Sequence, residues 1–108
     1  MRDHPLGPAL ATFRPLGVGV RTGVLPVNVS WPFPRSFSIY REGLSFQLFR
    51  VETWIPYEEI EMIMRGRGLI RFIWSNRGAK ASATISDWFR AGRIADALEG
   101  EGYRVVRS

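Results

Sequence analysis

The sequence predicts a mainly β fold, in which a series of short antiparallel strands is followed by one C-terminal helix. Apolar and polar residues alternate in several segments between Val18 and Ile85, and this period of two is typical of half-buried strands. Glycine and proline separate the segments at short intervals. Apolar residues at helical spacing follow Ser86. Parallel α/β folds need helices between their strands, so this order excludes them.

The composition fits one globular domain with one hydrophobic core. The chain has 108 residues, of which 45% are hydrophobic, and a chain of this size buries about two-thirds of its surface on folding. It contains no cysteine, which excludes disulfide scaffolds, thiolate metal sites and thiol nucleophiles. Three prolines and little periodicity predict an irregular tail or strap over residues 1–15, so we place the domain at residues 16–108.

The first strands are predicted from alternation and from the turns between them. Apolar residues alternate at 18–20 and again at 27–33, with a glycine and a proline marking the break. Prolines on both sides of Phe33 end the second strand. A hairpin is predicted next at 37–49, where we expect Gly43 to supply a positive φ in the turn.

Four more strands are expected before the helix. They are predicted at 52–55, 60–64, 69–74 and 79–85, and the second of them carries apolar residues at every second position. The strand at 69–74 is apolar on both faces apart from Arg71, which is typical of a central strand.

The helix is predicted at about residues 87–99. Ser86 is a suitable N-cap, and glycines end the helical pattern at its other side. Trp88, Ile94 and Leu98 share one face, so we expect them to close the open end of the sheet. A short extended segment is expected after the helix.

Part of the chain resembles a small bacterial pleckstrin-homology-like (PH-like) domain. The resemblance covers residues from about 35 to 100 and rests on three elements: the strand-turn-strand at 37–46, the segment Trp54-Ile-Pro-Tyr-Glu-Glu-Ile60, and the capped helix after Ser86. It implies a partly open antiparallel β-barrel that is capped at one end by the C-terminal helix.

The resemblance does not imply one function, because the fold serves lipid headgroups, peptides and proteins alike. The lipid-binding members of the family resemble one another in a basic cluster between the first two strands. Here that region, near residues 19–25, carries only Arg21. The chain therefore departs from the phosphoinositide-binding pattern.

Trp54 and Tyr57 are the candidate partner-binding residues. Most aromatic residues in the sequence lie at core spacing, including Phe46 and Trp88, whereas this pair flanks a proline. An exposed aromatic pair marks a protein-binding surface. We therefore expect a non-enzymatic module that binds a protein partner or a second copy of itself, through this surface or through an exposed sheet edge.

The net charge of +5 raises the alternative of an anionic partner, either membrane headgroups or nucleic acid. If the two basic turns between residues 65 and 80 lie on one rim, guanidinium groups and glycine N–H groups would form an anion site. We favour a simpler interpretation over this anion site, namely that both turns are ordinary solvated turns. The candidate anion-binding residues are Arg65, Arg67, Arg77 and Lys80.

The residue types argue against an enzyme. His4, the one histidine, lies in the predicted tail, and no histidine or cysteine accompanies the glutamates near residue 60 as a metal ligand or proton-transfer partner. We expect no catalytic, metal-binding or cofactor-binding residues. The sequence also shows no apolar run of signal-peptide or membrane-spanning length, so we expect a cytoplasmic protein, with peripheral membrane contact as the alternative.

Overall fold

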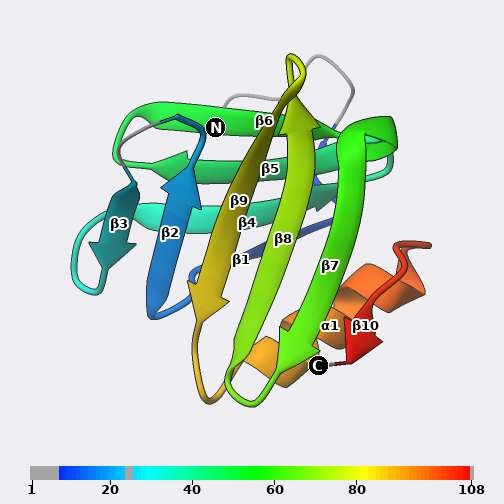
Figure 1. Ribbon diagram of the computed structural model, residues 1–108. Helices are drawn as coiled ribbons and strands as arrows, with labels where there is room; N and C mark the ends of the chain where they lie inside the picture. The colour runs from blue at the N-terminus through cyan, green and yellow to red at the C-terminus, as the bar shows by residue number, and fades with distance from the viewer. Residues whose placement is uncertain (1–7, 24–25, 108) are drawn as a thin grey trace.

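A computed structural model describes residues 8–23 and 26–107 of the chain as a mainly β structure with one α-helix (Figure 1). A single 3-10 turn, η1 (Tyr57–Glu59), interrupts the run of strands, and the helix is α1 (Ala91–Gly100). The strands are β1 (Ala11–Phe13), β2 (Gly17–Arg21), β3 (Val27–Ser30), β4 (Arg35–Tyr40), β5 (Gly43–Leu48), β6 (Val51–Pro56), β7 (Ile60–Gly66), β8 (Leu69–Asn76), β9 (Ala79–Ser86) and β10 (Val106–Arg107).

These strands form two sheets that lie across one another (Figure 1). The smaller sheet has the order β1-β4-β5-β6, and the larger has the order β10-β7-β8-β9-β2-β3. Neighbouring strands are antiparallel except β10, the expected extended segment, which runs parallel to β7. Among the described residues no pairing joins β6 to the larger sheet, so the sheets are not closed into a barrel. The mainly β class is confirmed. In place of the expected partly open barrel, the structure has two sheets packed against one another.

The core lies between the two sheets and is built around three phenylalanines. The ring of Phe37 lies 4.9 Å from that of Phe46 and 5.3 Å from that of Phe72, measured between centroids. Ile94 and Leu98 of α1 are fully buried and cover one end of this core, as predicted. Aromatic pairs at these distances add to the stabilisation that comes from burying their apolar area.

The prediction of an irregular tail is wrong for residues 11–13, which form β1 and pair with β4. The chain then turns at Pro15 and enters the larger sheet as β2. Arg35 Nε donates to the carbonyl of Pro15 at 2.6 Å, and Leu16 N donates to a carboxylate oxygen of Asp87 at 3.0 Å. A three-residue strand is too short to show periodicity, because pairing with a long neighbour stabilises it. Residues 1–7, including His4, lie outside the described residues.

The predicted strand at 27–33 ends earlier, at Ser30. The N–H of Phe33 donates to the carbonyl of Ser30 at 2.9 Å, which forms a turn. Trp31 and Phe33 are therefore not half-buried strand residues; they are 68% and 56% exposed. The reason is that the prolines beside Phe33 have no N–H to continue the ladder.

The hairpin of β4 and β5 is confirmed, but the expected role of Gly43 is wrong. Positive φ angles occur instead at Gly68 and Gly78, in the β7–β8 and β8–β9 turns. At Gly43 the constraint is space, since a Cβ atom would lie 2.5 Å from the carbonyl oxygen of Ile55 and 2.6 Å from the ring of Trp54. Glycine lets β6 and the Trp54 ring approach the backbone of β5 closely.

Replacing Gly43 with alanine is expected to lower the free energy of unfolding by about 2–3 kcal/mol, because the new methyl group overlaps backbone as well as a packed ring. Chemical denaturation measures this change. Gly100→Ala is the matched control, because no atom lies within 4 Å of a Cβ built there and its φ is not positive. A loss in the control as large as in Gly43→Ala would contradict the explanation.

Strand β7 is confirmed, but its buried face is not the one that alternation predicts. The register shifts between Ile60 and Met62, and this irregularity changes which side chains point inward. Ile63 is consequently 1% exposed, while Met62 is 41% exposed. Strand β8 lies between β7 and β9 as expected of a central strand, although one of its faces is open, since Arg71 is exposed.

The helix begins later than predicted, at Ala91, and Trp88 is not in the core. Asp87, not Ser86, caps the preceding turn, where its Oδ1 accepts hydrogen bonds from the N–H groups of Phe89 and Arg90. Trp88 is 70% exposed. Shifting the cap by one residue rotates the first turn, so the side chain of Trp88 points away from the core.

Candidate functional site

The predicted partner-binding pair, Trp54 and Tyr57, is divided between two aromatic contacts. The ring of Trp54 is partly buried and meets that of Tyr40 edge to face, with 5.4 Å between centroids. Tyr57 is 46% exposed; its ring lies 5.0 Å from that of Tyr103, and its hydroxyl donates to the carbonyl of Gly102 at 3.2 Å. Tyr57 is thus the exposed member of the pair, and both residues belong to the region where β6 ends.

Tyr103 fixes the residues after the helix to the β4–β5 hairpin. Its hydroxyl oxygen lies 2.6 Å from the carbonyl oxygen of Tyr40 and 2.9 Å from that of Gly43. Burial raises the pKa of Tyr103 to about 12, so the hydroxyl keeps its proton at neutral pH and donates to these carbonyls. This contact is structural, because the hydroxyl is buried.

The structure does not bring the four candidate anion-binding residues together. Arg67 lies in the turn before β8, and Arg77 lies in the turn after it. Eight residues of strand span about 26 Å, so the two turns are at opposite ends of the larger sheet. The condition for a shared anion site, that both turns lie on one rim, is not met.

The other two candidate cations have carboxylate partners. Arg65 Nη1 lies 3.2 Å from Asp96 Oδ1 and 3.3 Å from Glu99 Oε1, which joins β7 to α1. Lys80 Nζ lies 3.5 Å from Glu61 Oε1 across the larger sheet. These ion pairs account for Arg65 and Lys80 without a ligand.

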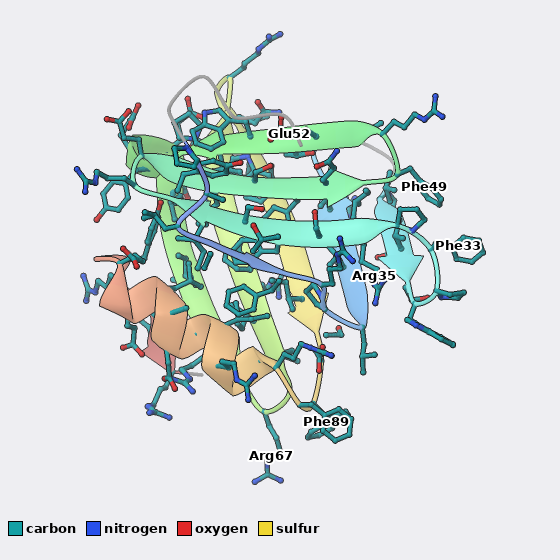
Figure 2. All side chains as sticks on the ribbon, turned by 180° about the vertical axis from the view of Figure 1, so that it is seen from behind. Phe33, Arg35, Phe49, Glu52, Arg67 and Phe89 are labelled. Atoms are coloured by element: carbon teal, nitrogen blue, oxygen red, sulfur yellow. The ribbon has the colours of Figure 1, made fainter. Side chains whose placement is uncertain are left out.

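A first exposed apolar surface lies beside an edge of the smaller sheet. Among the described residues, β5 is the strand that pairs with β6, which places β6 at the end of the strand order. Phe33, Phe49 and Val51 are 56%, 51% and 68% exposed, and the two phenylalanine rings are 6.0 Å apart. Figure 2 shows Phe33 and Phe49 on the same side of the molecule. We call Phe33, Phe49 and Val51, together with β6, the β6-edge surface.

A second group of exposed apolar residues surrounds Asp87. Trp88 and Phe89 are 70% and 83% exposed, and Leu16 and Leu69 are 38% and 39% exposed. The aromatic pair follows Asp87 directly, before the first turn of α1.

Asp87 holds this region in place through a buried carboxylate. Its side chain is 0% exposed and accepts hydrogen bonds from the N–H groups of Leu16, Phe89 and Arg90, and from Arg90 Nη1 at 3.0 Å. Burial alone would raise the pKa of Asp87, but the hydrogen bonds from Arg90 and from the backbone outweigh it and lower the pKa below its usual value. The carboxylate is therefore charged at neutral pH.

Sequence reasoning missed the exposed aromatic residues, although signals for four of them were present. The prolines beside Phe33 end the strand, and they also exclude Trp31 and Phe33 from it. For Trp88 and Phe89 the signal is an ambiguous N-cap, because Ser86 and Asp87 are both good N-cap residues. The choice between these two residues decides which of the following side chains face the core.

One hollow on the surface offers binding shape without a carboxylate or imidazole. A hollow of about 440 Å³ lies over β2, β3 and β9, and its described lining residues supply hydroxyls, one amide and the guanidinium of Arg21 but no carboxylate or imidazole. Within residues 8–23 and 26–107 no cluster of His, Cys, Asp and Glu has an arrangement that would hold a metal ion. In the same residues no helix is both long enough and apolar enough to cross a membrane.

Neither a protein-family model nor a curated protein sequence matches the chain. We therefore infer the function from the fold and the exposed surfaces.

Proposed function

We propose that this chain is a non-enzymatic interaction module of PH-like type, which binds protein and associates with a second copy of itself through the β6-edge surface. The observation that carries the proposal is that β6, among the described residues, is an edge strand of the smaller sheet and begins beside exposed apolar side chains.

The arrangement of the sheets supports the PH-like type. Two mainly antiparallel sheets lie across one another, the chain passes from one to the other at Pro15, and α1 covers one end of the core (Figure 1). Such a fold presents sheet edges and loops, and binding partners are then chosen by the residues on them.

The chemistry of an edge strand favours association by strand addition. Among the described residues no strand pairs with the outward side of β6, so an added strand would gain a ladder of backbone hydrogen bonds. Val51 is the first residue of β6 and Phe49 lies in the turn before it, and covering both would remove apolar surface from water. A second copy brings the same strand and the same apolar residues, which a two-fold interface requires.

Static light scattering during size-exclusion chromatography tests this proposal. We expect the molar mass to rise above that of one chain with increasing protein concentration. Val51→Lys should weaken the association by about tenfold or more, because a charged side chain at a sheet edge opposes strand addition.

Val27→Lys is the matched control. Val27 is also a half-exposed valine at the start of an edge strand, β3, in the other sheet. The control should associate as the unmodified protein does. A protein that stays monomeric at high concentration, or a control that dissociates equally, would contradict the assignment to β6.

A further inference from the structure

One end of the larger sheet carries five exposed apolar side chains, which we call the tip. The strands that meet there are β2, β3, β8 and β9, since Gly17 pairs with both Ser30 and Ser86, and Ser86 also pairs with Leu69. The exposed side chains lie at these paired positions or within three residues of them along the chain. The tip residues are Leu16 (38% exposed), Trp31 (68%), Leu69 (39%), Trp88 (70%) and Phe89 (83%).

Backbone hydrogen bonds connect the segments of the tip. Trp31 N donates to the carbonyl of Leu16 at 2.8 Å, and Asp87 N donates to the carbonyl of Gly68 at 2.9 Å. The carboxylate of Asp87 accepts from Leu16 N at 3.0 Å. Together these contacts join the four segments into one unit.

The exposure of the aromatic residues is therefore a fixed feature of the loop. Asp87 accepts from the N–H groups of both Phe89 and Arg90, which sets the direction of the loop between β9 and α1. The ring of Trp88 lies against Gly68, where a Cβ atom would be only 2.8 Å from it. A rigid loop that holds two adjacent aromatic residues in water presents apolar area with little loss of conformational entropy on binding.

The charge around the tip is positive. The segments that build it are residues 14–17, 30–31, 66–69 and 86–93, and they contain four arginines and one carboxylate, Asp87. The Asp87 side chain is 0% exposed and is paired with Arg90. All four arginines, Arg14, Arg67, Arg90 and Arg93, are exposed. Figure 2 shows Arg67 and Phe89 together at this extremity of the molecule.

We propose that the tip docks onto an anionic phospholipid bilayer. Tryptophan and phenylalanine insert into the region between headgroups and acyl chains, and arginines beside them attract anionic headgroups. The tip presents both types of residue on one protruding end. A bilayer fits this chemistry better than a second copy of the chain, because a two-fold contact through the tip would bring the same arginines against one another.

Co-sedimentation with vesicles tests the apolar part of the proposal. The protein should bind vesicles of mixed phosphatidylserine and phosphatidylcholine at low ionic strength, and it should not bind vesicles of phosphatidylcholine alone. The double variant Trp88→Ser/Phe89→Ser should bind the anionic vesicles at least about tenfold more weakly. The single variant Phe89→Ser, at the most exposed of the positions, should show part of that loss without disturbing Gly68.

The control for exposed aromatic residues is the double variant Phe33→Ser/Phe49→Ser. It removes two rings that are 56% and 51% exposed but belong to the β6-edge surface. Its vesicle binding should equal that of the unmodified protein. Equal losses in the two double variants would overturn the proposal.

A pair of charge reversals tests the place of the cations. Arg67→Glu and Arg77→Glu change the net charge equally, and they lie in turns at opposite ends of β8. Arg67→Glu should weaken binding to anionic vesicles about tenfold, whereas Arg77→Glu should change it by less than about twofold. Equal effects would show that net charge, not the tip, governs the binding, and would overturn the proposal.

Two further outcomes would also overturn it. One is the absence of binding to anionic vesicles at low ionic strength. The other is a lower molar mass of Trp88→Ser/Phe89→Ser by light scattering in the absence of lipid, which would make the tip a protein interface. Val51→Lys should keep full vesicle binding, so the two proposed surfaces fail or succeed separately.

Discussion

Phe46→Ala is expected to lower the free energy of unfolding by about 4 kcal/mol, because it opens a cavity at the centre of the core. Phe46 is 0% exposed, and its ring lies 5.1 Å from that of Phe72 and 6.5 Å from that of Trp74. Both of those residues come from the other sheet. The substitution therefore removes contacts across the interface between the sheets, and chemical denaturation measures the loss.

Phe49→Ala is the control for this prediction. Phe49 lies in the turn after β5, near Phe46 in sequence, but it is 51% exposed. Its loss should cost less than about 1 kcal/mol, since an exposed ring gains little from burial. Similar losses for Phe46→Ala and Phe49→Ala would contradict the packing of the two sheets around the phenylalanines.

Asp87→Ala is expected to cost about 3 kcal/mol of stability. The substitution leaves the N–H groups of Leu16, Phe89 and Arg90 without their acceptor and leaves Arg90 without its buried partner. The same contacts connect the β1–β2 corner to the start of α1. The control is Asp96→Ala, whose side chain is 73% exposed and whose loss should cost about 0–1 kcal/mol.

The lowered pKa of Asp87 also predicts a pH dependence. A carboxyl whose pKa is lower in the folded than in the unfolded state stabilises the fold at pH values above its ordinary pKa, which is 3.8 for Asp87. This contribution disappears as the pH falls through the lowered pKa of the folded state. The difference in stability between the unmodified protein and Asp87→Ala should therefore shrink in acid. A difference that stays constant from neutral pH to the acid range would show that the carboxylate charge is not the source of the effect.

Local sequence determined most of the strands, because alternation and turn residues act within a few positions. The hairpin of β4 and β5 and the strands β8 and β9 lie where alternation predicts them. The predictions that failed depended on distant partners. β1 was missed because three residues become a strand only beside β4, and the inward face of β7 was missed because a shift near Ile60 changes the alternation.

The candidate sites were less predictable than the strands. Exposure of an aromatic residue depends on which elements cover it, and spacing along the chain does not report that. Trp54 was expected to be exposed and is partly buried, whereas Trp88 was expected in the core and is 70% exposed. The four candidate anion-binding residues are close in sequence, but the eight-residue strand β8 separates the turn of Arg67 from the turn of Arg77.

The sequence by itself determined a mainly β chain, its hairpins and an amphipathic helix near its end, because the period of apolar residues and the positions of glycine and proline act locally. Only the tertiary structure decided which residue caps the turn that precedes that helix. Ser86 and Asp87 are equivalent as local caps, and a hydrogen bond from Leu16, 71 residues earlier, favours Asp87. That long-range contact also decides that Trp88 and Phe89 face water, because it fixes where the chain turns from strand to helix.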